Sequence, residues 1–127
     1  MRRYARDHTW VVTEGKRARV GISDFAQAEL GDIAYVELPA VSRRMKRGEV
    51  ACTVDSLKSS SEIYAPVSGT VIEVNAPLSD EKRCGIVNRD PLGEGWLFVI
   101  EMDDPQELSL LLPEEEYAAF IRGADSR

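Results

Sequence analysis

The sequence predicts a mainly β fold, a sandwich or flattened barrel, with one short internal helix and one C-terminal helix. Three observations favour this class. Short segments of alternating apolar and polar residues recur, glycine- and proline-containing turns separate them, and two further segments carry helix signals. The composition, with 43% apolar and 30% charged residues among 127, is that of a globular protein, and we expect a single domain over residues 1–127.

The predicted strands are short and mostly amphipathic. In the second of them Ala18, Val20 and Ile22 share one face and arginines occupy the other, so one face is expected to be buried. The strands cover, in chain order, residues 9–13, 17–22, 33–38, 50–54, 70–74 and 96–102. Residues 75–91, with two prolines and several charges, are predicted to form a long irregular loop.

Capping signals and apolar spacing predict the two helices. Asp24 and Gln27 form a capping-box pattern, and Gly31 is placed to end the internal helix. The second helix is predicted from about Pro113 to Arg122, with Gly123 ending it. Its apolar stripe, which we expect to pack on the sheet, consists of Tyr117, Phe120 and Ile121.

Charge and reactive residues argue against several classes of function. The net charge of −6 disfavours general binding of nucleic acid. Two cysteines make neither a disulfide framework nor a metal set; Cys52 is predicted to be a core residue, and Cys84 to lie in the polar loop as an incidental or reactive thiol. A single histidine, His8, makes a triad or histidine metal site hard to build. With no long apolar run and no signal peptide, we expect a cytoplasmic protein.

The most informative residue is Lys58, in the polar turn that follows strand 50–54. A turn at the end of a sheet projects into water, and the small hydroxyl residues around Lys58 leave its amine unshielded. An exposed lysine taken alone is usually only a solubilising charge. Its sequence context is unusual, because Asp55 precedes it by three residues and Ala65-Pro66 and Gly69 follow at fixed distances.

This context, Lys58 followed by Ala65-Pro66 and then Gly69, resembles the swinging-arm carrier domains. In those domains lipoate or biotin is joined by an amide bond to a lysine at a hairpin tip, which removes the lysine charge. Biotin carriers present Met-Lys-Met, whereas Leu57 and Ser59 flank the lysine here. The Met45-Lys46 pair lies in a basic run with no Ala-Pro segment behind it. Asp55 three residues before the lysine therefore favours lipoate.

A longer set of motifs resembles the H-protein family of the glycine cleavage system, from about Tyr4 to Ile121. The matching stretches are His8-Thr-Trp10, Val20-Gly-Ile-Ser-Asp-Phe-Ala-Gln27, Leu30-Gly-Asp-Ile33, Val36-Glu-Leu-Pro39, Lys46-Arg-Gly-Glu49, Asp55-Ser-Leu-Lys58, Ala65-Pro-Val-Ser-Gly69, Glu73-Val-Asn75, Val87-Asn88, Asp90-Pro91 and Gly93-Glu-Gly-Trp96. The family fold is a barrel-sandwich hybrid of two sheets, with the lipoyl lysine on a hairpin.

The resemblance implies a non-catalytic lipoyl carrier. Lys58 would hold the lipoate, and Asp55 would be recognised by the lipoylating enzyme, a lipoate ligase or an octanoyl or lipoyl transferase. The arm would serve glycine decarboxylase, aminomethyltransferase and dihydrolipoamide dehydrogenase in turn. In the family, a cleft on the protein also shelters the loaded arm. From their positions in the sequence, the residues expected to line this cleft are Glu14, the Ser23-Asp24 pair and the segment 29–32.

Several positions depart from the family pattern. The family usually has glutamate at Asp55, glycine at Ser42, proline at Cys84 and an aromatic residue at Leu92. None of these changes removes the acceptor lysine. They leave open the alternative that the chain is an H-like paralogue, which acts in lipoate relay or in another lipoyl-linked pathway.

Two further classes of protein compete with a lipoyl carrier. A biotin carrier is disfavoured by Leu57 and Ser59, which stand where that class has methionines. An enzyme in its own right is disfavoured because the sequence offers no evident nucleophile, base or metal cluster.

Overall fold

The computed structural model describes residues 2–125, and their strands form two antiparallel sheets. The larger sheet has the order β10-β1-β2-β3-β9-β8-β5, and the smaller has the order β4-β6-β7. The strands are β1 (Arg2–Tyr4), β2 (Thr9–Glu14), β3 (Arg17–Ile22), β4 (Ile33–Glu37), β5 (Arg44–Met45), β6 (Val50–Ser56), β7 (Ser60–Tyr64), β8 (Gly69–Val74), β9 (Phe98–Met102) and β10 (Leu112–Pro113). The predicted mainly β class is confirmed.

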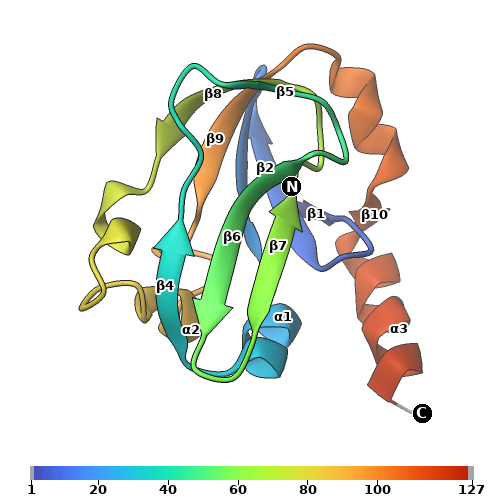
Figure 1. Cartoon of the computed structure of the whole chain (residues 1–127). Helices are drawn as coiled ribbons and strands as arrows, with labels where there is room; N and C mark the ends of the chain where they lie inside the picture. The colour runs from blue at the N-terminus through green and yellow to red at the C-terminus, as the bar shows by residue number, and fades with distance from the viewer. Residues whose placement is uncertain (1, 126–127) are drawn as a thin grey trace.

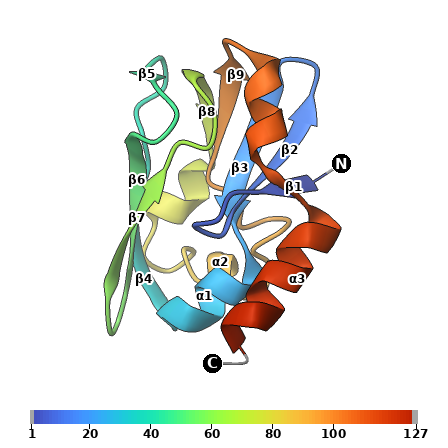
Figure 2. The same ribbon diagram turned by 90° about the vertical axis from the view of Figure 1, so that its right-hand side faces the viewer.

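The two sheets face each other, with the main core between them (Figures 1 and 2). The larger sheet contributes Ala18, Val20 and Ile22, all buried as their alternation predicted. The smaller sheet contributes Val54 and Cys52, which confirms that Cys52 is a core residue. Burial raises the pKa of the Cys52 thiol to about 12, so it stays protonated at neutral pH.

The C-terminal helix α3 (Glu114–Asp125) packs beside β1 and β10 at one edge of the larger sheet (Figure 2). The stripe residues Tyr117, Phe120 and Ile121 join a second apolar cluster there, as predicted. In that cluster the Tyr4 and Tyr117 rings stack with centroids 4.0 Å apart. The predicted end at Gly123 is wrong, because the helix continues through it; one glycine costs a helix only about 1 kcal/mol.

The predicted irregular loop 75–91 is more ordered than expected. It holds a 3₁₀ helix, η1 (Ala76–Ser79), and a short helix, α2 (Ile86–Arg89). Cys84 is fully buried against the core, and its Sγ lies 3.6 Å from the carbonyl oxygen of Ile33. Of the two alternatives for Cys84, the reactive thiol is therefore wrong, since burial hides the sulfur and raises its pKa. A second 3₁₀ helix, η2 (Pro105–Leu110), follows β9.

Within residues 2–125, no helix has both the length and the apolar character needed to cross a bilayer.

Candidate functional site

Lys58 lies in the exposed three-residue turn between β6 and β7, at the end of the smaller sheet (Figure 1). The return strand of this hairpin is residues 60–64, a segment in which the sequence alternation predicted no strand. Only Ile63 of the return strand is buried, so this serine-rich segment lacks the alternation of apolar and polar residues that predicts a strand. The predicted strand at 70–74 does exist as β8, but it pairs with β9 and β5 in the other sheet.

The hydroxyl of Ser56 organises the turn. It accepts hydrogen bonds from the backbone N–H groups of Lys58, at 3.3 Å, and Ser59, at 3.0 Å. It also donates to the Ser59 carbonyl oxygen, 3.1 Å away, and the Ser56 N–H donates to the same oxygen at 2.8 Å. These local bonds fix the backbone under Lys58 while its side chain stays exposed. Leu57 beside it is 79% exposed.

The tip of the hairpin is also tied to the corner between α1 (Asp24–Leu30) and β4. The Leu57 N–H donates to the Asp32 carbonyl oxygen at 3.0 Å. The side chain of Asn88, on α2, braces the same corner: its Nδ2 donates to the Gly31 carbonyl at 2.8 Å, and its Oδ1 accepts from the Ile33 N–H at 2.9 Å. A short helix, a chain corner and the hairpin tip thus form one hydrogen-bonded unit. No local sequence pattern marks Asn88 as part of the site.

We expect Asn88→Ala to lower the free energy of unfolding by about 2 kcal/mol, because two backbone groups at a half-buried corner lose their partners. Chemical denaturation measures this loss. Asn88→Asp keeps the acceptor for Ile33 but loses the donors, so its loss should be smaller. The exposed neighbour Arg89 is the control, and Arg89→Ala should change stability by less than about 0.5 kcal/mol. Equal effects of the Asn88 and Arg89 variants would contradict this role.

Asp55 points to the outer face of the smaller sheet. Its neighbour Val54 is buried on the inner face, and the Asp55 carboxylate accepts a hydrogen bond from the hydroxyl of Ser60 on the paired strand. Among the residues that the structure describes, the ion pairs are Arg17–Glu73, Arg44–Asp103 and Arg83–Asp80. Asp55 is therefore not engaged by Lys58 and presents a negative charge on the surface near the turn.

A cleft of about 430 Å³ lies between α1 and β7, beside the hairpin. Ala26, Glu29 and Leu30 line it from α1, and Ser61 and Ile63 line it from β7. The lining is therefore mixed: it combines apolar side chains with the carboxylates of Asp7 and Glu29 and the hydroxyl of Ser61.

His8 closes another side of this cleft. Its Nδ1 lies 2.7 Å from the hydroxyl of Tyr117, which lies 2.7 Å from the hydroxyl of Ser23. Ser23 also accepts from the Ala26 N–H and caps α1, a position that the sequence pattern had assigned to Asp24. Burial lowers the pKa of His8, so its neutral form is favoured. These bonds fix the imidazole and the start of α1 against α3.

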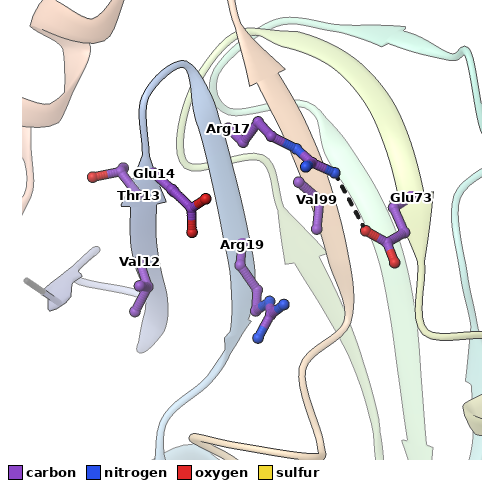
Figure 3. Close-up of a pocket in the computed structure, with 7 residues that line it drawn as sticks. All are labelled: Val12, Thr13, Glu14, Arg17, Arg19, Glu73 and Val99. Carbon is purple, nitrogen blue, oxygen red and sulfur yellow. Dashed lines mark ion pairs between the residues drawn. The ribbon is translucent and has the colours of Figure 1, made fainter.

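The residues expected to line a cleft for the arm border three different hollows. Glu29 and Leu30 line the cleft beside the hairpin, but Glu14 is the last residue of β2 and borders a separate hollow of about 210 Å³ on the larger sheet. Figure 3 shows that hollow, with the Arg17–Glu73 ion pair 3.6 Å long across it. Ser23 and Asp24 border another hollow, on the side of α1 that faces α3. Sequence position alone did not reveal which face of α1 meets the hairpin.

An exposed lysine on a braced hairpin tip, at the end of two facing antiparallel sheets, defines a carrier domain of the biotinyl and lipoyl class. The family model described as glycine cleavage H-protein matches residues 2–124 of the chain. The chain belongs to this family. Its members carry lipoate, and membership gives the chain the role of the H carrier component in glycine cleavage.

Individual relatives agree with this assignment. The glycine cleavage system H protein of Thermotoga maritima is 47% identical over 120 residues, which cover 94% of this chain and 95% of that protein. The one from Coprothermobacter proteolyticus is 49% identical over 120 residues, covering 94% and 93%. A crystal structure of a glycine cleavage system H protein from Mycobacterium marinum aligns with a TM-score of 0.83 at 35% identity, covering 93% of this chain and 94% of that one.

Proposed function

We propose that Lys58 is the residue to which lipoate is attached, and that residues 1–127 act as one lipoyl-carrier domain that catalyses no step itself. The observation that carries the proposal is the exposed Lys58 amine on a rigid turn, in a chain that belongs to a lipoate-carrying family. In residues 2–123 the structure shows no hydrogen bond or ion pair to its Nζ, so a modifying enzyme meets a free amine. Attachment forms an amide from this amine and the activated carboxyl group of lipoate, and removes one positive charge.

The attached group suits the surroundings of Lys58. When bound, lipoate would supply a disulfide that accepts the aminomethyl group at glycine decarboxylase as carbon dioxide leaves. Aminomethyltransferase would then remove this group, and dihydrolipoamide dehydrogenase would re-form the disulfide. The chain's own part is to hold the root of the arm still and to leave its far end free. The bonds from Ser56 and from Asp32 do the first, and the exposed side chain of Lys58 allows the second.

The remaining reactive side chains support a carrier over an enzyme. Both cysteines are buried with raised pKa values, and His8 is committed to Tyr117 through its Nδ1. Reconstitution tests the proposal: the lipoylated chain is combined with glycine decarboxylase, aminomethyltransferase, dihydrolipoamide dehydrogenase, tetrahydrofolate and NAD. We expect glycine-dependent NADH formation that requires lipoylated protein. Turnover without lipoylation would contradict the carrier role, and efficient lipoylation without turnover would favour the H-like paralogue.

We further propose that the lipoylating enzyme recognises the carboxylate of Asp55. Asp55→Asn should slow lipoylation about fivefold, because one exposed charge in an enzyme contact contributes on the order of 1 kcal/mol. Asp55→Glu keeps the charge and should stay near the wild-type rate. Glu37→Gln removes an exposed carboxylate from β4 in the same sheet and serves as the control. The measurement is the initial rate of mass gain with a lipoate ligase, lipoate and ATP; equal rates for Asp55→Asn and Glu37→Gln would refute the role.

A further inference from the structure

The aliphatic stem of Lys58 lies directly over Gly31, the residue that ends α1. A β-carbon built on Gly31 would stand 3.2 Å from Cε of Lys58, 3.7 Å from Cδ and 3.8 Å from Nζ. The first of these distances is tighter than a normal carbon contact. The lysine, although exposed, therefore does not extend freely from the turn; its last methylene groups rest on the bare α-carbon of a glycine.

The surface under the stem is rigid. The Gly31 N–H donates to the Gln27 carbonyl oxygen at 3.0 Å, and the Gly31 carbonyl accepts from Asn88. The next residue, Asp32, accepts from Leu57, which directly precedes the lysine in the turn. The root of the side chain and the surface on which it rests are thus bonded to each other. Their relative position does not depend on the mobility of an exposed loop.

This contact determines where an attached group begins. Leu30 and Glu29, immediately before Gly31 on α1, line the cleft between α1 and β7. A stem that rests on Gly31 places Nζ at the end of α1 that leads into this cleft.

We propose that Gly31 is a positioning residue: its missing side chain makes a seat for the Lys58 stem, which holds the root of the attached arm at the mouth of the cleft. The proposal rests on the attachment of lipoate to Lys58. It adds a feature that shifts the arm from positions in solvent toward a held position at the cleft. A methyl group at residue 31 would force the stem to move by a few tenths of an ångström, and we expect this shift to weaken its hold and to move the arm toward solvent.

The backbone of Gly31 offers a competing reason for the glycine. Its φ of +82° is in the region that favours glycine, so any substitution there is strained whatever Lys58 does. Gly48 separates the two reasons. Its φ of +91° imposes a similar strain, but nothing lies within 4 Å of a β-carbon built on it. Gly31→Ala and Gly48→Ala therefore both place alanine at a positive φ, and only Gly31→Ala also brings a β-carbon against the lysine.

The first test uses the unmodified protein and nuclear magnetic resonance. In the wild type we expect a nuclear Overhauser effect between the Gly31 α-protons and the Lys58 ε-protons, and slower side-chain motion for Lys58 than for the exposed Lys46. Gly48→Ala should leave both signals unchanged. The absence of the Overhauser effect, or Lys58 motion equal to that of Lys46 in the wild type, would overturn the proposal even if Gly31→Ala failed to fold.

The second test uses the lipoylated protein and a water-soluble phosphine. The phosphine reduces the lipoyl disulfide to two thiols and is oxidised to its oxide with oxygen from water. We expect the wild type to react more slowly than free lipoamide, Gly31→Ala to react about threefold faster than the wild type because a few carbon contacts are lost, and Gly48→Ala to match the wild type.

Equal reduction rates for the two alanine variants, or a wild-type rate equal to that of free lipoamide, would contradict the proposed role of Gly31. Failure of the wild type to accept lipoate would appear earlier, as a missing mass increase. That result would count against the proposed attachment site, while the resonance test on the unmodified chain would still decide whether the seat exists.

Discussion

We expect the replacement of Lys58 with arginine to abolish glycine cleavage in the reconstituted system and to leave the stability of the protein unchanged. Arginine keeps the charge and the length of the side chain, but its guanidinium stays protonated and is not acylated. Because the side chain is exposed, the free energy of unfolding should stay within about 0.5 kcal/mol of the wild type. Glycine-dependent NADH formation measures the activity, and it should fall to the level found without the carrier.

Lys46→Arg is the matched control for this variant. Lys46 is also exposed and is the lysine of the second Met-Lys pair, but it follows β5 and lies outside the hairpin tip. Its replacement should leave the activity at the wild-type level. Wild-type activity in Lys58→Arg, or a loss in both variants, would show that the arm is not attached at Lys58 or that the role of the lysine is not specific.

The second large effect is expected at Gly69, the glycine that closes the motif after Lys58. A β-carbon there would overlap the backbone carbonyl oxygen of Glu101 and stand 2.6 Å from Cγ2 of Ile100, both on the paired strand β9. A carbonyl within a sheet cannot move aside without breaking its ladder. We therefore expect Gly69→Ala to lower the free energy of unfolding by at least about 3 kcal/mol, at the upper end of overpacking effects.

Chemical denaturation with the wild type in parallel measures the effect of Gly69→Ala. Gly15→Ala is the control, since nothing lies within 4 Å of a β-carbon there and only its left-handed backbone, with a φ of +61°, opposes the change. Its cost should be about 1 kcal/mol. A Gly69→Ala protein as stable as the wild type would show that the strands at this point separate easily. The expected result would mean that Gly69 is needed for the packing of the sheet and has no part in the attachment chemistry.

Much of the fold follows from local patterns that the sequence displays openly. The alternation of Ala18, Val20 and Ile22 predicted a half-buried strand, and burial of all three confirms it. The spacing of Tyr117 and Phe120 predicted a packed helix face. These predictions succeed because one element decides which of its residues meet the core, and its neighbours hardly alter that choice.

The errors concern features that depend on partners distant in the chain. Strand β7 shows one buried residue, Ile63, so its pairing with β6 is visible only when both strands are in place. Cys84 has polar neighbours in the sequence, yet the fold places it against the carbonyl of Ile33. Local polarity does not indicate burial in such segments, because it is the path of the chain that buries them.

The candidate site shows the same division. The exposed turn with Lys58 was predictable, since alternation and small polar residues mark it locally. The bracing by Asn88 and the seat at Gly31 join residues that lie far from the turn in sequence, and no spacing reveals them. Glycine at the end of a helix is a common capping signal, so its second role under the lysine stem is not distinguishable before the fold is known.

The most direct test of the carrier role is the mass of the protein isolated from its own source, followed by peptide mapping. We expect one lipoyl adduct, located on the peptide that contains Lys58. The same adduct should form on the unmodified recombinant chain after incubation with lipoate, ATP and a lipoate ligase. An adduct on another lysine, a biotin adduct, or no adduct under either condition would contradict this expectation.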